Sequence, residues 1–113
     1  MTRYLLIMLI LATTSVHADT PPIMLAEDAI AQHRLFYYPR PEYPYEARRR
    51  SITGSGVFDL RFDYDTGHLR EVHVASGTGS PLLDSAAIGA LKRWQAKPRM
   101  VRKIRVPVTF TKG

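Results

Sequence analysis

The chain has 113 residues, of which 45% are hydrophobic, and its formal net charge at neutral pH is +6. This length allows one small domain and excludes two, and the hydrophobic content is typical of a globular protein and not of a disordered one. The chain contains no cysteine, which excludes a disulfide framework and a thiolate metal site.

The N-terminus has the pattern of an export signal. Arg3 supplies a positive start, an apolar run extends from Tyr4 to Ala12, and Thr13 begins a polar step. A bilayer span needs about 20 apolar residues, so this run is too short to cross a membrane. The residues up to Ala18 suit a signal peptidase, and residues 1–18 are therefore predicted to be a cleaved signal peptide. An N-terminal core helix and an uncleaved membrane anchor are the alternatives.

Residues 19–38 form a segment that precedes the domain. Pro21 and Pro22 suit the first turn of a helix, and apolar residues follow at mixed spacing. We expect a helix here that docks on the domain or on a partner. Further on, the prolines from Pro39 to Pro44 hold the chain extended. A short helix from Tyr45 to Arg50 is expected next.

Two strands with a period of two are predicted in the middle of the chain. The first runs from Gly56 to Tyr64 and the second from Leu69 to about Ser76. Between them, Gly67 can take the positive φ of a tight turn. The two strands should therefore form a hairpin, with His73 pointing to solvent.

A helix and a last strand complete the predicted domain. Ser80 can cap the helix, Pro81 suits its first position, and Pro98 lies beyond its end. The last strand extends from about Arg102 to Thr111. Pro107 has no backbone N–H, so this strand cannot donate a hydrogen bond to a neighbouring strand at that position. This strand is therefore expected at an edge, or with the missing N–H facing outward.

The order of elements predicts an α+β fold: a small antiparallel sheet of about three strands with two helices on one face. The side chains that face the helices should form the core. They are Phe58, Leu60, Phe62, Val72, Val74, Leu83, Leu91, Trp94, Ile104, Val106 and Phe110.

No constellation of residues points to catalysis or to a cofactor. The turn that starts at Asp63 lacks the glycine and glutamate of a calcium loop, and the three later histidines share no metal-ligand spacing. We expect no enzyme activity, no metal and no cofactor. After Asp84 the chain has eight basic residues and no acidic one, which in a cytoplasmic protein would favour nucleic acid. The predicted export argues against that partner.

Several short motifs occur in one order. They are Tyr43-Pro44 with Ala47, Gly56, Gly67, Ser76-Gly77, Leu83-Asp84 with Ala86-Ala87, Trp94 with Pro98, and Val106-Pro107-Val108-Thr109-Phe110. This ordered set resembles the TonB C-terminal domain family and covers Pro39 to Thr111, so that residues 39–113 are interpreted as the domain. The resemblance implies a periplasmic location and a non-enzymatic role linked to transmembrane transport.

The resemblance also implies a partner and a binding site. Domains of this family receive a short peptide, the TonB box, from an outer-membrane transporter, and the peptide adds as a strand. In this chain the accepting edge would be the last strand, with a contribution from the residues before Tyr43. The implied binding residues are Arg40, Pro41, Arg102, Lys103, Ile104, Arg105, Val106, Val108 and Thr109. The three cations of the last strand suit an acidic peptide.

The chain departs from the energy transducers of this family. Those proteins keep an N-terminal membrane helix and a long proline-rich linker, whereas here about 20 residues separate the predicted signal from Tyr43. Two alternatives therefore stay open. One is a structural or assembly component of an envelope complex, including a homodimer, and the other is an anchored transducer with an uncleaved helix.

Overall fold

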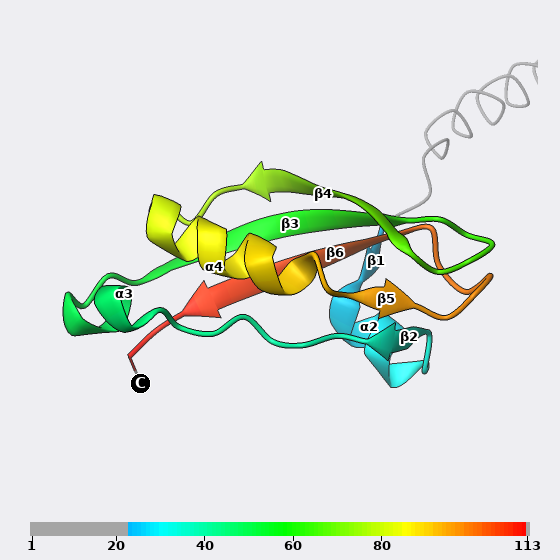
Figure 1. The fold of residues 1–113 in the computed structure, drawn as a ribbon, viewed down its shortest axis with the longest axis horizontal. Helices are drawn as coiled ribbons and strands as arrows, with labels where there is room; N and C mark the ends of the chain where they lie inside the picture. Colours follow the sequence, from blue (N-terminus) through cyan, green and yellow to red (C-terminus); the bar gives the residue numbers. More distant parts are fainter. Residues whose placement is uncertain (1–22, 113) are drawn as a thin grey trace, which may run out of the picture.

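The computed structural model describes residues 23–112, and the predicted signal peptide lies outside these residues. Figure 1 shows one long sheet with helix α4 across one face and a smaller two-stranded sheet at one end. Within residues 23–112 no helix is long and apolar enough to span a bilayer. The elements are β1 (Met24–Leu25), α2 (Ala26–Ala31), β2 (Leu35–Tyr37), α3 (Tyr45–Arg49), β3 (Gly54–Phe62), β4 (Leu69–Ser76), α4 (Pro81–Leu91), β5 (Gln95–Ala96) and β6 (Lys103–Phe110).

The predicted α+β fold is confirmed, and the large sheet has the strand order β1-β6-β3-β4. The three long strands β4, β3 and β6 are antiparallel to one another, as expected. The difference is β1, which adds to the outer side of β6 as a parallel strand. The parallel strand β1 makes the sheet mixed. With only two residues, β1 is too short to show the alternation of apolar and polar residues by which a strand is predicted.

The β3–β4 hairpin turns where the sequence predicts it. Gly67 has a φ of +84°, and its N–H donates to the Asp63 carbonyl at 2.7 Å. The Gly67 carbonyl accepts from the N–H of Ala96 at 2.8 Å. The turn therefore reverses the chain and also forms a hydrogen bond with β5 of the smaller sheet.

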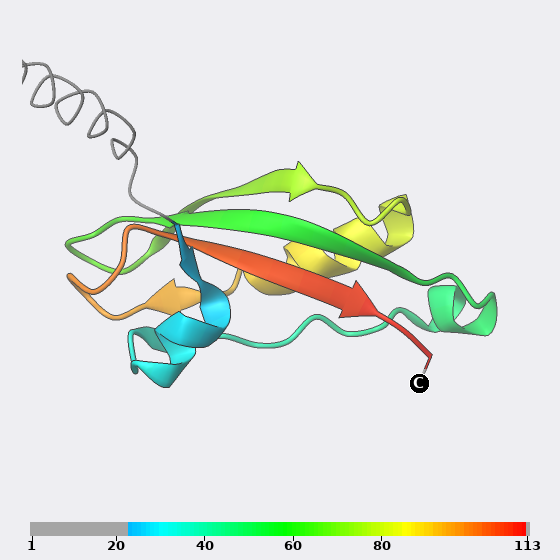
Figure 2. The same ribbon diagram turned by 180° about the vertical axis from the view of Figure 1, so that it is seen from behind.

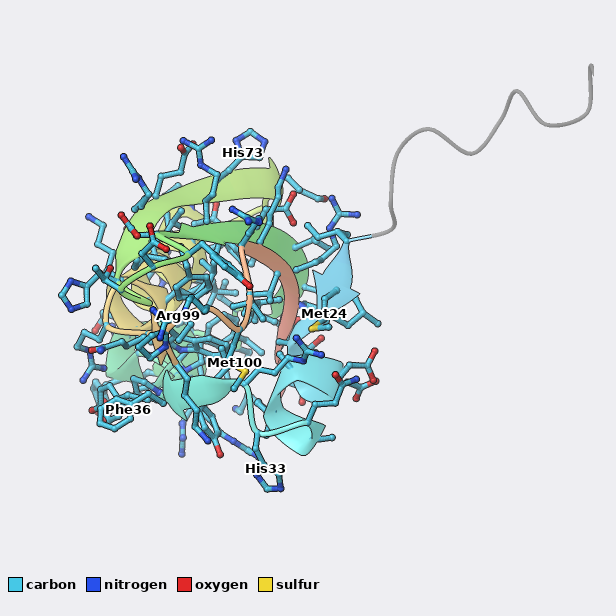
Figure 3. All side chains as sticks on the ribbon, turned by 90° about the vertical axis from the view of Figure 1, so that its right-hand side faces the viewer. Met24, His33, Phe36, His73, Arg99 and Met100 are labelled. Carbon is cyan, nitrogen blue, oxygen red and sulfur yellow. The ribbon has the colours of Figure 1, made fainter. Side chains whose placement is uncertain are left out.

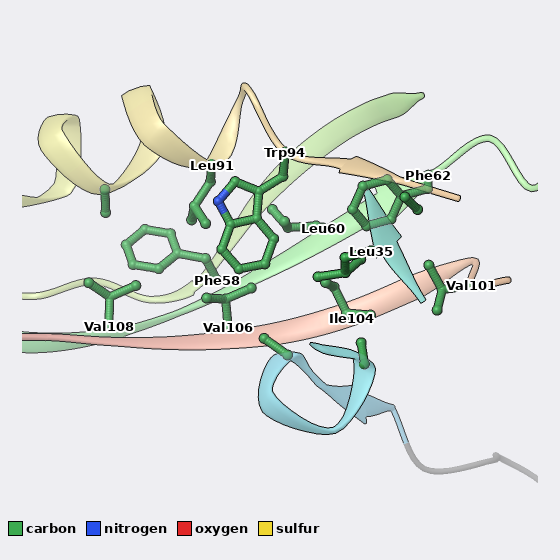
Figure 4. Packing of buried hydrophobic residues seen from close by; sticks show 14 of the residues in the cluster. Leu35, Phe58, Leu60, Phe62, Leu91, Trp94, Val101, Ile104, Val106 and Val108 are labelled. Carbon is green, nitrogen blue, oxygen red and sulfur yellow. The ribbon is translucent and has the colours of Figure 1, made fainter. Parts of the chain in front are cut away.

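Helix α4 begins as predicted and covers the core. The Ser80 hydroxyl accepts from the N–H of Leu83, and Pro81 occupies the first helical position. Below the helix, the buried side chains of β3 and β6 pack against Leu91 and Trp94, as Figure 4 shows. Nine of the side chains that the sequence assigns to the core are buried: Phe58, Leu60, Phe62, Leu83, Leu91, Trp94, Ile104, Val106 and Phe110.

Two side chains on the sheet differ from expectation in their burial. Val72 is half-buried and Val74 is 40% exposed, because α4 lies over β3 and β6 and leaves much of β4 uncovered. Asp59 is buried, although it alternates along β3 with the core residues Phe58 and Leu60. His73 does point outward from β4, as Figure 3 shows.

The described part of the segment before the domain is not one helix. It forms β1, then the six-residue helix α2, and then β2, which pairs with β5. Ala26 and Ala29 are buried in the same core as β3 and β6. The apolar face of α2 therefore docks on the domain, which is one of the two placements expected from the sequence.

Gly67 provides a test of the turn. A Cβ atom at this position would lie 2.0 Å from the Ala96 carbonyl oxygen. Gly67→Ala should therefore lower the free energy of unfolding by about 2 kcal/mol or more, since a backbone clash adds to the cost of a positive φ. Urea unfolding measures this loss.

Gly79→Ala is the matched control, because Gly79 also has a positive φ but open space around its Cα. It should cost only about 1 kcal/mol. Equal losses in the two variants would contradict the role assigned to the contact with Ala96.

Candidate functional site

The direction of the backbone N–H and C=O groups alternates along β6, and this alternation determines which of them can reach a partner. The N–H of Phe62 donates to the carbonyl of Arg102 at 2.9 Å, so position 102 directs its backbone groups toward β3. Backbone direction alternates along an antiparallel strand. The even-numbered residues of β6 therefore pair with β3, while the odd-numbered residues direct their N–H and C=O groups to the outer edge.

Strand β1 covers only the first part of this outer edge. Met24 is aligned with Ile104 and Leu25 with Arg105. Beyond Arg105, no described strand pairs with the outer side of β6. The outward backbone groups that remain are the carbonyl of Pro107 and the N–H and C=O of Thr109. As expected, the missing N–H of Pro107 faces outward and costs the β3 ladder nothing.

An extended segment runs beside this free edge and is fixed at two points. The indole Nε1 of Trp94 donates to the Pro39 carbonyl at 2.8 Å. The hydroxyl of Tyr43 donates to the Ile52 carbonyl at 2.6 Å, and its ring lies 5.7 Å from that of Phe110. Figure 2 shows the chain between β2 and α3 following the course of β6. The two hydrogen bonds hold this segment as a wall opposite the strand edge.

A groove of about 820 Å³ lies between the edge and the wall. Its lining is largely apolar and aromatic, with Glu27 and Arg40 as its charged members. The lining residues are Leu25, Ala26, Glu27, Ile30, Tyr38, Arg40, Pro41, Tyr43, Trp94, Val106, Pro107, Val108, Thr109, Phe110 and Thr111. An unpaired strand edge beside an apolar groove is suited to an added strand whose alternate side chains enter the groove.

The structure brings five of the predicted binding residues together in this groove: Arg40, Pro41, Val106, Val108 and Thr109. The sequence does not predict that Trp94, which it assigns to the core, and Tyr43 line the groove. The hydrogen bonds of Trp94 and Tyr43 fix the fold and also place their aromatic rings on the groove.

The other four predicted binding residues do not line the groove. Ile104 is buried in the core, and it lies with Arg105 on the part of β6 that is aligned with β1. The guanidinium of Arg102 stacks over the ring of Tyr64, 4.0 Å from its centroid. Lys103 is exposed beside Asp59 and Arg61 on the open face of the sheet. Cations of the last strand are therefore not the ones that a peptide in the groove would meet.

Arg105 is held by Asp59 across the β3–β6 pair. Its Nε and Nη2 atoms donate to the two carboxylate oxygens at 2.8 and 3.0 Å. These hydrogen bonds, with the positive charge of Arg105, hold the pKa of Asp59 below its ordinary value of 3.8, although burial acts to raise it. Alternation along β3 shows on which face the Asp59 side chain lies, but it does not show the partner of that side chain on β6.

Comparison with known proteins agrees with this architecture. The family model for the Gram-negative bacterial TonB protein C-terminal matches residues 39–112. The chain belongs to the TonB C-terminal family. It is 25% identical over 95 residues to protein TonB of Vibrio cholerae, covering 79% of this chain but only 37% of that protein.

A solved structure shows the same fold. The chain superimposes on the solution structure of the Pseudomonas aeruginosa TonB C-terminal domain with a TM-score of 0.59 at 21% sequence identity. The match covers 69% of this chain and 84% of the solved one. The motifs that carried the resemblance have physical roles here, since Tyr43 and Trp94 fix the groove wall and Gly67 forms the turn.

The Asp59–Arg105 pair gives a pH-dependent prediction. A carboxylate whose folded pKa is lowered stabilises the fold above its unfolded pKa, and this contribution is lost as the pH falls through the folded value. Asp59→Asn should lower the free energy of unfolding by about 1–2 kcal/mol at pH 7, the low end for a charged hydrogen bond, because Arg105 is half-exposed. Below pH 3.8 the difference between the variant and the natural protein should shrink. A difference that is constant from pH 7 to pH 2 would contradict this assignment.

Proposed function

We propose that this chain is a periplasmic binding domain of the TonB type that captures an extended peptide of an outer-membrane transporter by strand addition. The observation that carries the proposal is the free outer edge of β6 beside an apolar groove. The role is one of binding, without catalysis. Because the chain spans 37% of the length of the Vibrio cholerae protein, its part in transport is also a proposal.

The groove supports this function through two kinds of recognition. The outward groups of Pro107 and Thr109 offer backbone hydrogen bonds, which do not depend on the peptide sequence. The rings of Tyr38, Tyr43 and Trp94 offer an apolar surface for the side chains that alternate along the peptide. Main-chain pairing would thus provide affinity and the groove would provide selectivity.

The position of the wall supports the proposal further. Ordering a loop upon binding costs free energy, but the wall is already fixed by the Trp94–Pro39 and Tyr43–Ile52 hydrogen bonds. The groove is therefore formed before a peptide arrives, and binding needs to order mainly the peptide.

Thr109→Pro tests the proposed edge. The substitution removes the outward N–H but leaves the even-numbered positions that pair with β3 unchanged. Affinity for peptides from the N-terminal segments of outer-membrane transporters should fall by about threefold to tenfold, the effect of one lost hydrogen bond. Isothermal titration calorimetry measures the affinity.

Thr109→Val is the control, because it changes the side chain and keeps the N–H. It should bind like the natural protein. Both variants should retain the unfolding midpoint to within a few degrees. Equal affinities for Thr109→Pro and Thr109→Val, or no binding by the natural protein, would overturn the proposed mode of binding.

A further inference from the structure

Half of the basic residues that follow Asp84 gather in one loop. It joins β5 to β6 and is called the basic loop here, with residues 97–103; its cations are Lys97, Arg99, Arg102 and Lys103. Figure 1 places this loop at the right-hand end of the molecule, beside the β3–β4 turn, whereas α3 lies at the opposite end. None of the four cations lines the groove. Within residues 23–112, none of them forms an ion pair with a carboxylate.

An exposed methionine stands among these cations. Met100 is 42% exposed, whereas Val101 beside it is buried in the core. Figure 3 looks onto this end of the molecule and shows Arg99 and Met100 on it, with Phe36 of β2 at its margin. Phe36 is 68% exposed. Exposed apolar side chains among cations are typical of a surface that enters the headgroup region of a bilayer.

Hydrogen bonds to the backbone hold the basic loop in this shape. The N–H of Arg99 donates to the Tyr64 carbonyl at 2.6 Å, and the Nη1 of Arg34 donates to the Met100 carbonyl at 2.7 Å. Arg99 has a φ of +58°, which costs free energy in a residue other than glycine. Backbone strain of this kind is concentrated at functional sites. The loop is therefore held with Met100 exposed, and it does not have to be ordered by a partner.

The carboxylates near this end do not neutralise the basic loop. Asp59, Asp63 and Glu71 are each bound by an arginine outside the loop. The exposed carboxylates without such a partner are Asp65 of the β3–β4 turn and Glu27 and Asp28 of α2. The four cations of the loop and Arg34, which binds neutral groups, outnumber these three. This end therefore carries a net positive charge that suits an anionic surface.

The placement of the basic loop leaves the groove accessible. The groove follows β6 from Val106 to Thr111, and so it extends away from the loop, which precedes β6. The described chain also begins beside the loop, since Met24 is aligned with Ile104. A surface that contacts this end would therefore meet the start of the domain and leave the free edge of β6 uncovered.

We propose that the basic loop, with Phe36 at its side, docks the domain on the surface of a membrane that contains anionic lipids. The cations bind lipid phosphates, and Met100 enters the headgroup region between them. The docked domain keeps its groove open to a peptide. The docking does not depend on the proposed strand addition, because the two surfaces share no residue.

Co-sedimentation of the full chain with vesicles tests the role of charge. The vesicles contain equal parts of phosphatidylglycerol and phosphatidylcholine, or phosphatidylcholine alone. The natural protein should bind the anionic vesicles more tightly, and added salt should reduce the difference. Arg99→Gln/Lys103→Gln should lower the affinity for anionic vesicles by about tenfold to thirtyfold, since each cation near an anionic surface contributes about fivefold.

Arg48→Gln/Arg50→Gln is the matched control for this pair. It removes the same charge at α3, at the opposite end of the domain. Within residues 23–112, neither arginine forms an ion pair with a carboxylate. This variant should bind anionic vesicles like the natural protein.

A fluorescent label tests which end meets the lipid. The chain has no cysteine, so Met100→Cys can carry a single environment-sensitive fluorophore. Its emission should rise and shift to the blue with anionic vesicles. Val74→Cys is the control, because Val74 is 40% exposed against 42% for Met100 but lies on β4, away from the basic loop. Its label should respond little.

The outcomes separate this docking from peptide binding. Equal affinity of the natural protein for the two kinds of vesicle would overturn the docking, as would equal affinity of the two paired variants for the anionic vesicles. A label at Met100 that responds no more than one at Val74 would overturn it as well. Thr109→Pro should bind vesicles like the natural protein, so that a failure of peptide binding leaves the vesicle result unchanged.

Discussion

The backbone phase of β6 is the constraint on which the rest of the structure depends. Its even-numbered residues place their side chains in the core and their backbone groups against β3, while its odd-numbered residues turn to the open face and the outer edge. One alternation thus sets the burial of Val106 and Val108, the pairing of Arg105 with Asp59 and the exposure of the Thr109 backbone. A shift by one residue would exchange all of these roles.

Core packing and the groove share the same side chains. Trp94 is buried under the end of α4, yet its indole N–H crosses to Pro39 and holds the wall in place. Tyr43 does the same at the other end through Ile52. Loss of either contact would therefore affect both the stability of the fold and the shape of the groove.

The sequence predicts elements whose signals are local. The β3–β4 hairpin follows from a period of two and from Gly67, and α4 follows from Ser80 and Pro81. The short strands could not be predicted, because β1 is too short to show a period and β2 pairs with β5 through tertiary contacts. Because the sequence does not reveal β1, it predicts an accepting edge along the whole of the last strand. Only the structure shows that β1 leaves its second part free.

The most direct test of this account is hydrogen exchange of the β6 amides, measured by NMR on the free protein and on the protein with a transporter peptide. The Thr109 amide should exchange rapidly in the free protein, while the amides of Val106 and Val108, which face β3, should be protected. Addition of the peptide should slow the exchange of Thr109. A Thr109 amide that is already protected in the free protein, or that stays fast with peptide bound, would contradict the central claim.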